Sequence, residues 1–385
     1  MTSIDRAVVL AAGEGRRTRP LTRYQPKPML RVAGRPILEY PLDALADSGV
    51  ESVVLVVGHA KNRIQNHFES SYRNLDLTYV TQSTQLGSGH ALQAAAEYAG
   101  ETFLVVNGDN VIDAAMVRGT VSRYVESDAA ACLAVTSSNR TAEYGTVGIR
   151  DGLVERIDED GHSSSARVNT GVYAFDRTIF DALERTDFVD GERPLTGAIG
   201  ELTGDVVATT PNGVWFDPSY PWDLLSTNRT IIYSHPELVA VVSPIDDSAR
   251  VHDSAVVGEN VLIGPDCKVS AGAVVRDGTC LHASTIVGEN TVLEGSIVGP
   301  DSRVGANAVL RDTIVGGGAT IGDGTVSPGR SATAPSTPTG GSVESSPTVR
   351  RSVPTSRSRP GVGSVRGGPS PPASTSDTTS PRAWR

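Results

Sequence analysis

Apolar runs of strand length alternate with helix-like segments through the first 230 residues. Five of these runs are continuous and rich in β-branched residues, a pattern typical of strands buried on both faces of a parallel sheet. They are Ala7–Ala12, Ser52–Val57, Leu77–Val80, Thr102–Val106 and Ala130–Val135. Between them, Pro36–Ser48 predicts a helix with Pro in its first turn and Gly49 at its C-terminal cap, and Ser88–Tyr98 predicts one with a Ser cap. The alternation predicts an α/β domain.

A different period follows, in which an aliphatic residue returns about every six positions. Three such hexapeptides make one triangular coil of a parallel β-helix, with the aliphatic side chains stacked inside. The run is long enough for about four coils, and we predict a left-handed parallel β-helix. The positions are Val251, Val257, Ile263, Val269, Val275, Leu281, Val287, Leu293, Val298, Val304, Leu310, Val315 and Ile321.

These patterns divide the chain into an α/β domain at 1–232, a connector at 233–248, the β-helix at 249–326 and a tail at 327–385. The tail is rich in Ser, Pro, Thr, Gly and Arg and almost lacks aliphatic side chains, so we predict that it is disordered. It is either a flexible tail or the product of a reading-frame shift near codon 326 in a GC-rich gene. We favour the second interpretation because the composition changes abruptly.

The chain has 34 basic and 44 acidic residues, and its net charge is −10. The tail carries eight Arg against one Glu and one Asp, which leaves residues 1–326 at −16. This acidity argues against nucleic acid or an anionic membrane as a partner, and the scarcity of Lys beside Arg is typical of proteins that work in concentrated salt. The three cysteines suggest neither a disulfide framework nor a zinc site, and the N-terminus resembles neither a signal peptide nor a membrane span. We therefore expect a cytoplasmic protein.

A glycine-rich turn directly follows the first predicted strand, in the run LAAGEGRRTRPLT at 10–22, and Lys27 follows between two prolines. Such a turn lets backbone N–H groups approach phosphate oxygens, and Arg and Lys supply charge for a polyphosphate. The competing interpretation is a dinucleotide-binding fold. Thr18 stands where its third glycine belongs, and the prolines prevent an immediate helix, so we favour the polyphosphate.

The run LAAGEGRRTRPLT followed by PKPM resembles the signature of the sugar-1-phosphate nucleotidyltransferases, which make nucleotide-diphosphate sugars. Arg16 and Thr18 depart from the usual residues, while Arg17 keeps the register of the signature arginine. The resemblance implies a Rossmann-like domain in which Arg17 and Lys27 are catalytic groups that act on the phosphates. It also implies nucleotide contacts from the turn, at Leu10, Ala12, Gly13 and Gly15.

Further motifs follow in the order that the family has. The segment QSTQLGSGHA at 82–91 resembles the base-reading segment of uridylyltransferases. The resemblance implies that the amide of Gln82 pairs with uracil or thymine, that Gly87 leaves room for the ring, and that Ser88 lies in the nucleotide site. We interpret His90 as a structural residue at a helix start.

Two carboxylates resemble the magnesium ligands of the family. Asp109 ends the run VNGD at the carboxyl end of a strand, where ligands lie in open α/β sheets. Asp217 belongs to WFDPSYPWDLL at 215–225, where Ser219 replaces a usual Gly. By itself Asp109 would be read as a turn residue. The resemblance implies Asp109 and Asp217 as Mg²⁺ ligands, with Asp223 a helix cap.

Three loop positions match the sugar-binding positions of the family, namely the backbone at Gly145, the carboxylate of Glu155 and the amide of Asn169. The resemblance implies that an oxygen of a sugar-1-phosphate, either glucose-1-phosphate or N-acetylglucosamine-1-phosphate, attacks the α-phosphorus of UTP or dTTP and releases pyrophosphate. Positioning and charge neutralisation then supply most of the catalysis. The β-helix implies a homo-oligomer, a trimer or a multiple of it.

Three alternatives differ in class. One is a bifunctional enzyme that also acetylates glucosamine-1-phosphate, although about four coils are few for a complete acetyl-CoA site. Another is a noncatalytic scaffold of the same fold, which would not need Arg17, Lys27, Asp109 and Asp217 together. The third is a glycosyltransferase, which would require an Asp-x-Asp motif that Gly108-Asp109-Asn110 does not supply.

Overall fold

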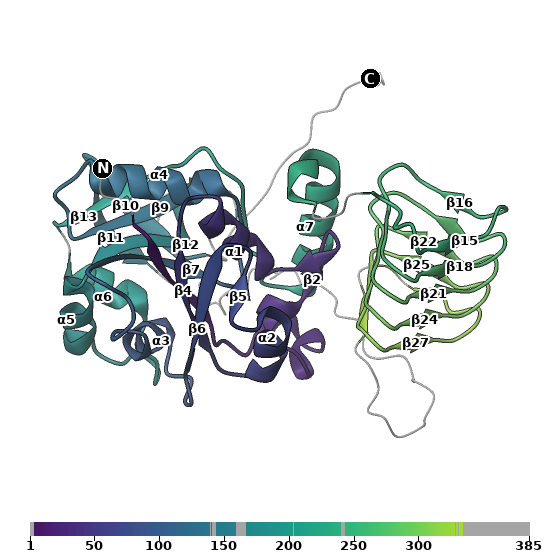
Figure 1. Cartoon of the computed structure of the whole chain (residues 1–385), viewed down its shortest axis with the longest axis horizontal. Helices are drawn as coiled ribbons and strands as arrows, with labels where there is room; N and C mark the ends of the chain where they lie inside the picture. Colours follow the sequence, from purple (N-terminus) through teal and green to yellow (C-terminus); the bar gives the residue numbers. More distant parts are fainter. Residues whose placement is uncertain are drawn as a thin grey trace, which may run out of the picture. The chain divides into compact units, whose positions relative to one another are not determined.

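The structure is a computed structural model of the whole chain, and it describes residues 4–138, 140, 144–158, 167–202, 204–239, 243–327, 329 and 331–333. The described residues comprise an α/β domain, which ends with helix α7 (Pro221–Ser234), and a coil of short parallel strands (Figure 1). Most of the tail predicted at 327–385 lies outside them. None of the described helices is long and apolar enough to cross a membrane.

A ten-stranded sheet forms the centre of the α/β domain, in the order β10-β11-β13-β9-β12-β7-β1-β4-β6-β5. Strands β7, β1, β4 and β6 pair in parallel. The strands are β1 (Arg6–Ala11), β4 (Ser52–Val57), β5 (Ser71–Tyr72), β6 (Leu75–Thr81), β7 (Thr102–Asn107), β9 (Ala131–Ser137), β10 (Thr146–Arg150), β11 (Leu153–Asp158), β12 (Arg167–Asp176) and β13 (Val206–Thr209). Two small sheets pair β2 (Arg31–Val32) with β3 (Arg35–Pro36), and β8 (Val111–Ile112) with β14 (Trp215–Phe216).

All five predicted strands are present, but the expectation that they are continuously buried parallel strands needs two corrections. Strand β6 buries alternate residues along its first half because it lies beside the short edge strand β5. Strand β9 is buried and pairs in parallel with β13, but on its other side it pairs antiparallel with β12, which separates it from β7. The apolar run of β12 is interrupted at 169–171 (NTG), which hides it from a search for continuous runs.

Helices cover both faces of this sheet. Alternate residues of β1 contribute to two separate cores, Val9 with Leu42 on one face and Val8 with Leu92 on the other. The first core contains residues of α1 (Glu39–Ala46), α2 (Lys61–Phe68) and α4 (Ala114–Val125), and the second contains residues of α3 (Ser88–Ala94), α5 (Thr178–Arg185) and α6 (Leu195–Glu201). Short 3-10 helices are η1 (Arg16–Thr18), η2 (Leu21–Arg23), η3 (Lys27–Met29) and η5 (Pro236–Leu238).

Two predicted helix starts are wrong in detail. Pro36 belongs to β3, ahead of α1, and so does not occupy a first helical turn. Ser88 is the first residue of α3, whose N-cap is Gly87, and its hydroxyl accepts a backbone N–H from the start of α6 instead of capping its own helix. The predicted C-terminal cap of α1 is also wrong in detail, because the C-cap is Asp47. Gly49 follows two residues later with a φ of 86°, the left-handed conformation that favours glycine.

Three parallel sheets form the coil after α7. They are β15-β18-β21-β24-β27, β16-β19-β22-β25 and β17-β20-β23-β26-β28. Each strand pairs with the strand one coil later, as Val251 does with Val269, so three hexapeptides make one coil as predicted. The strands are β15 (Arg250–Val251), β16 (Val256–Val257), β17 (Leu262–Ile263), β18 (Lys268–Val269), β19 (Val274–Val275), β20 (Cys280–Leu281), β21 (Ile286–Val287), β22 (Val292–Glu294), β23 (Ile297–Val298), β24 (Arg303–Val304), β25 (Val309–Arg311), β26 (Thr313–Val315), β27 (Thr320–Ile321) and β28 (Ser331–Thr333).

The predicted aliphatic positions fill the interior of this parallel β-helix, and most of them are buried in one cluster. Buried hydroxyls also join successive coils: Thr285 donates to the carbonyl oxygen of Gly299, and Thr291 to that of Gly305. The coil continues past the boundary predicted at 326, because β28 pairs in parallel with β26. The left-handed sense of the coil stays a prediction.

One outer face of the β-helix contacts the α/β domain. In each strand of the β-helix, the residue before the inward aliphatic side chain faces outward. On the sheet that contains β17, these outward residues are covered by the α/β domain and form one hydrophobic cluster with Leu21, Leu30 and Leu224. At the same contact, Asn228 of α7 donates to the carbonyl oxygen of Gly278. The outward residues of this face are Leu262, Cys280, Ile297, Ile314 and Ala332.

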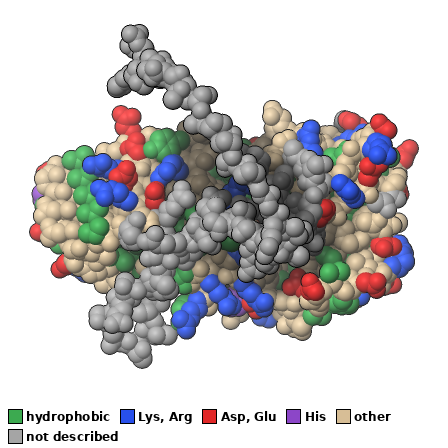
Figure 2. All heavy atoms as spheres, turned by 180° about the vertical axis from the view of Figure 1, so that it is seen from behind, with side chains coloured by type: hydrophobic (Ala, Val, Ile, Leu, Met, Phe, Trp, Pro, Cys, Tyr) green, Lys and Arg blue, Asp and Glu red, His purple; other side chains and the backbone are tan. Residues whose placement is uncertain are grey.

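Acidic and basic side chains lie interspersed on the face of the molecule seen in Figure 2. Ion pairs join some of the charged side chains of the α/β domain, since Arg73 contacts both Asp43 and Asp47. The described residues of the face in Figure 2 show no large basic patch, which fits the argument against nucleic acid or an anionic membrane as a partner.

We predict that Leu293→Ala lowers the free energy of unfolding by about 2–5 kcal/mol, because this fully buried side chain would leave a cavity between coils. Urea unfolding followed by circular dichroism measures the change. Arg303→Ala, at an exposed outward position, is the control and should change it by less than about 0.5 kcal/mol. Equal losses in the two variants would contradict a packed interior.

Candidate active site

The glycine-rich turn after β1 is held in one conformation by two hydroxyl groups. Thr18 and Thr22 donate to the carbonyl oxygen of Gly15 at 2.8 and 2.7 Å. Gly15 has a φ of 60°, and a Cβ atom there would lie 2.8 Å from the Cβ of Lys27, so the position requires glycine. Among the described residues, the N–H groups of residues 13–15 have no hydrogen-bond partner. The turn can therefore offer several N–H donors to an anion.

A cavity of about 360 Å³ opens against this turn. Its wall contains every residue that the sequence assigns to nucleotide binding, together with Lys27 and Asp109. A Cβ atom at Gly13 would meet no other atom within 4 Å, so the turn faces open space there. The nucleotide-binding positions in the wall are Leu10, Ala12, Gly13, Gly15, Gln82, Gly87 and Ser88.

The side chain of Gln82 is buried at one end of this cavity with a fixed orientation. Its amide nitrogen donates to the carbonyl oxygen of Gly87 at 3.1 Å and contacts Nδ1 of His90 at 2.9 Å. A Cβ atom at Gly87 would lie 2.6 Å from the carbonyl oxygen of Arg193, so this close approach requires glycine. The carbonyl oxygen of Gly87 can only accept a hydrogen bond, so the side-chain atom of Gln82 that faces it must be the amide nitrogen. The amide oxygen of Gln82 is then the atom that remains for a ligand. The structural interpretation of His90 holds, with the added role of orienting Gln82.

Sequence reasoning assigned no role to several other polar residues of this wall, among them Gln85 and Glu192. The amide nitrogen of Gln85 donates to the carbonyl oxygen of Ala12 at 2.8 Å and so fixes the end of β1 against the segment that follows β6. Glu192 reaches the same cavity from the segment before α6. Gln85 lies within a segment already assigned to base reading, whereas nothing in the local sequence marks Glu192.

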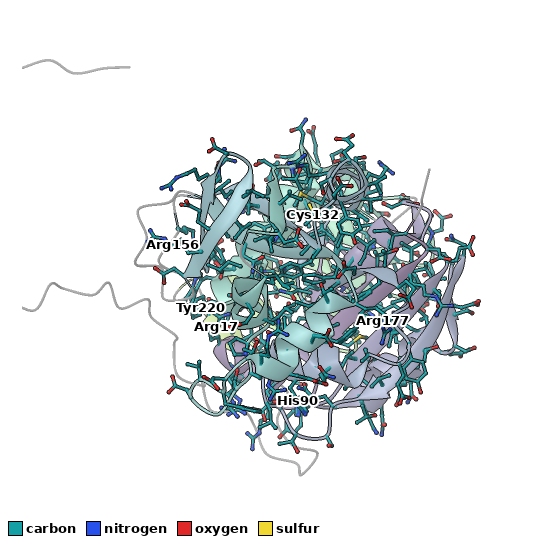
Figure 3. The ribbon with its side chains drawn as sticks, turned by 90° about the vertical axis from the view of Figure 1, so that its left-hand side faces the viewer. Arg17, His90, Cys132, Arg156, Arg177 and Tyr220 are labelled. Carbon is teal, nitrogen blue, oxygen red and sulfur yellow. The ribbon has the colours of Figure 1, made fainter. Side chains whose placement is uncertain are left out.

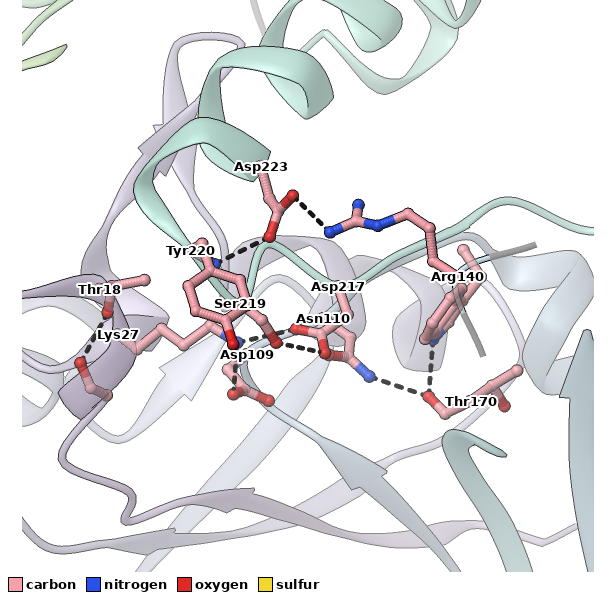
Figure 4. A network of polar contacts seen from close by, with 12 residues as sticks. Thr18, Lys27, Asp109, Asn110, Arg140, Thr170, Asp217, Ser219, Tyr220 and Asp223 are labelled. Carbon is pink, nitrogen blue, oxygen red and sulfur yellow. Dashed lines mark hydrogen bonds and ion pairs between the residues drawn. The ribbon is translucent and has the colours of Figure 1, made fainter. Parts of the chain in front are cut away.

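Lys27 lies between Asp109 and Asp217 (Figure 4). Its Nζ is 2.8 Å from Oδ2 of Asp109 and 2.9 Å from Oδ1 of Asp217, and only 5% of the residue is exposed. The three residues come from η3, from the end of β7 and from the segment after β14. Burial by itself would lower the pKa of the ammonium group, but the two carboxylates outweigh it and raise the pKa of Lys27. Lys27 is therefore protonated at neutral pH.

A second cavity, of about 640 Å³, lies on the other side of this contact. Asp217 lines the second cavity, whereas Lys27 and Asp109 line the first. The Lys27 ammonium group therefore marks the boundary between the two. Other residues of the second wall include Ser138, Arg140, Tyr144, Trp215 and Asp223.

The residue that departs from the family pattern, Ser219, contributes to this geometry. Its hydroxyl is buried and donates to Oδ2 of Asp217 at 2.7 Å, so it holds the carboxylate that accepts from Lys27. The sequence predicts Asp223 as a helix cap, but the N-cap of α7 is Tyr220, and Asp223 is the third helical residue, which completes a capping box. It accepts the backbone N–H of Tyr220 at 2.9 Å and pairs with Arg140 at 2.9 Å. Both oxygens of Asp223 are used in these contacts, and both oxygens of Asp217 accept hydrogen bonds as well, but only Asp217 contacts Lys27.

The three predicted sugar-binding residues are only partly brought together. The backbone N–H of Asn169 donates to the carbonyl oxygen of Gly145 at 2.9 Å. The side-chain amide of Asn169 already bonds the hydroxyl of Tyr173. Glu155 lies exposed on β11, where it pairs with Arg150 at 2.9 Å, and it lines neither cavity. The structure does not bring Glu155 to the other two, and the role assigned to it stays a prediction.

Arg17 also lies away from the cavities. Its guanidinium is exposed and is centred 5.5 Å from the ring of Tyr220, beside which it lies in Figure 3. Arg16 lines the first cavity instead, bonded to Glu14 at 2.6 Å. A role for Arg17 on the phosphates would need its side chain to turn inward, and it stays a prediction.

Comparisons with known proteins identify the family of the chain. Residues 6–222 match the family model for the nucleotidyl transferases, and residues 241–333 match the model for the GMPPB C-terminal domain. The UTP--glucose-1-phosphate uridylyltransferase AglF of Haloferax volcanii is 38% identical over 225 residues, which cover 56% of this chain and 92% of that protein. The Bifunctional protein GlmU of Methanocaldococcus jannaschii is 27% identical over 349 residues, which cover 83% of this chain and 79% of that protein.

Among solved structures, the UDP-glucose pyrophosphorylase from Acinetobacter baumanii superposes with a TM-score of 0.54 at 26% identity, covering 61% of this chain and 96% of that one. The family model spans more than half of the chain and includes the glycine-rich turn, Lys27, Asp109 and Asp217. The chain therefore belongs to the nucleotidyl transferase family.

Proposed function

We propose that the chain transfers the nucleotidyl group of UTP or dTTP to glucose-1-phosphate or N-acetylglucosamine-1-phosphate, forming a nucleotide-diphosphate sugar and pyrophosphate. The observation that carries the proposal is the contact of Lys27 with Asp109 and Asp217 at the boundary of two cavities, one of which faces the glycine-rich turn. The activity named for the Haloferax relative supports this substrate class. We expect the reaction in the cytoplasm, where nucleoside triphosphates are available.

The reaction forms a bond across this boundary. A phosphate oxygen of the sugar-1-phosphate, bound in the second cavity, attacks the α-phosphorus of the nucleotide bound in the first. The bond from the α-phosphorus to the bridging oxygen breaks, and pyrophosphate leaves with that electron pair. Because the attacking oxygen is already anionic, no general base is needed. The N–H groups of residues 13–15 bind the phosphates, and Lys27 neutralises charge at the reacting centre.

Asp109 and Asp217 fit a magnesium ion. Their oxygens already converge on one cation, the ammonium group of Lys27, and carboxylates are ligands that Mg²⁺ prefers. No group of three or more His, Cys, Asp and Glu side chains suited to a metal occurs in the described ranges. This is consistent with Mg²⁺, which is commonly held by one or two carboxylates plus substrate phosphates. When bound, it would neutralise the phosphate oxygens around the reacting phosphorus.

The orientation of the Gln82 amide supports the binding of a pyrimidine base that has an N3–H group. Its fixed amide oxygen can accept that N–H, which uracil and thymine share, and so both UTP and dTTP fit. Two other candidates remain from the sequence. A noncatalytic scaffold is disfavoured by the contact between Lys27 and the two carboxylates, because these residues line the two cavities and do not belong to the β-helix. A bifunctional enzyme stays open, because several relatives carry the name Bifunctional protein GlmU.

We also propose that copies of the chain associate through the β-helix, as a trimer or a multiple of it. On the sheet that contains β16, one outward residue of every coil is valine, and the end members are 61% and 67% exposed. The charges beside this column are matched within the chain, where Glu294 pairs with Arg276 and Arg311, so the proposal rests on the apolar surface of the valines. The column comprises Val256, Val274, Val292, Val309 and Val326.

We predict that Asp109→Asn and Asp217→Asn each reduce pyrophosphate release about 10²–10³-fold, because each removes a negative oxygen from the proposed metal position while keeping the size of the side chain. Circular dichroism should show an unchanged fold. Asp128→Asn, at an exposed position away from both cavities, is the control. Turnover near that of the unmodified protein in either variant would remove that residue from the reaction.

For the valine column, we predict that Val274→Glu converts the oligomer to monomers with an unchanged circular dichroism spectrum, because it adds like charge at the centre of the contact. Sedimentation velocity measures the mass. Arg303→Glu, outward on a different face, should leave the mass unchanged. A monomeric unmodified protein, or an oligomeric Val274→Glu variant, would contradict association through this column.

A further inference from the structure

The contact between Lys27 and the two aspartates already has a cation at its centre. The ammonium group is within hydrogen-bond distance of one oxygen from each carboxylate, and the lysine side chain is 7% exposed. Two carboxylates this close would repel each other without a positive charge between them. In the protein without substrates, Lys27 supplies that charge.

A divalent cation bound by Asp109 and Asp217 would take this same position. It would use the oxygens that now accept from Lys27, and a second positive charge beside the ammonium group would be repelled. Metal ion and ammonium group therefore compete for the two carboxylates.

The glycine-rich turn offers the ammonium group an alternative position. The Cβ of Lys27 lies against Gly15, so the lysine stem begins directly beside the turn that lines the first cavity. A triphosphate held by those N–H groups would place anionic oxygens within the swing of the side chain. Lys27 could then exchange two carboxylates for phosphate oxygens without moving its backbone.

We propose that Lys27 is a stand-in cation, which occupies the metal position in the free protein and leaves it for the phosphates when a nucleoside triphosphate binds. The metal site is then open only while the triphosphate is present, and free metal ion has low affinity for the protein alone. The second half of this inference rests on the proposed function, since it takes a triphosphate as the ligand. The first half concerns only Lys27, Asp109 and Asp217.

The test measures metal binding without nucleotide. Mn²⁺, whose free form is counted by electron paramagnetic resonance, is titrated into the unmodified protein and into Lys27→Met, which keeps the length and apolar stem of the side chain. We expect Lys27→Met to bind one Mn²⁺ about tenfold or more tightly than the unmodified protein, because two uncompensated carboxylates are left. Lys61→Met is the matched control, since Lys61 is bonded only to Thr81 Oγ1 among the described residues, and it should not change the affinity.

A second variant shows that the gain arises at this site. Adding Asp217→Asn to Lys27→Met should return Mn²⁺ affinity to that of the unmodified protein or below. The unfolding temperature, measured with Mn²⁺ and with a chelator, should rise with metal for Lys27→Met and hardly change for the unmodified protein. This readout also applies if Lys27→Met is less stable.

Equal Mn²⁺ affinities for the unmodified protein and Lys27→Met would overturn the proposal, as would a gain that survives Asp217→Asn. These results do not depend on turnover. A protein that fails to release pyrophosphate but shows the expected Mn²⁺ titrations would contradict the proposed function and leave the stand-in role of Lys27 in place.

Discussion

One ammonium group shared by two carboxylates is the interaction on which the rest of the site depends. Lys27, Asp109 and Asp217 come from three separate parts of the chain, and the Lys27 ammonium group would not be stable in this position without the carboxylates, because a buried charge requires a partner. Together they fix the meeting point of the two cavities. The carboxylates are thereby gathered in advance of any substrate, and the lysine remains charged because its pKa is raised.

The sheet brings these groups together through its parallel centre. Strands β1 and β7 are neighbours, so the glycine-rich turn that follows one and Asp109, which follows the other, meet at the same edge. The small sheet of β8 and β14 then brings Asp217 across to them, with Ser219 bonded to it. The α/β core thus positions the loops that carry the charged groups. Helix α7 packs against one face of the β-helix.

Much of this could be predicted from the sequence because the informative patterns are local. The hexapeptide period fixes which side chains enter the β-helix, and the glycine-rich turn, Gln82 and Asp109 each follow directly on a strand.

What could not be predicted depends on contacts distant in sequence. The insertion of β12 is decided by pairing with β7 and β9, and β28 joins the coil although its sequence, SAT, has only a small apolar residue. Likewise, the site roles of Arg17 and Glu155 are assigned from their positions in sequence motifs. In the structure the side chain of Arg17 lies over Tyr220, and that of Glu155 pairs with Arg150.

The central claim is that this site joins a pyrimidine nucleotide to a sugar-1-phosphate, and pyrophosphate release over a matrix of substrates tests it most directly. UTP and dTTP are each combined with glucose-1-phosphate and N-acetylglucosamine-1-phosphate in the presence of Mg²⁺, with ATP and with omission of the sugar phosphate as controls. The account predicts pyrophosphate from at least one pyrimidine pair, little from ATP, and none without a sugar phosphate. Release that is independent of the sugar phosphate, or absent from all four pairs, would contradict it.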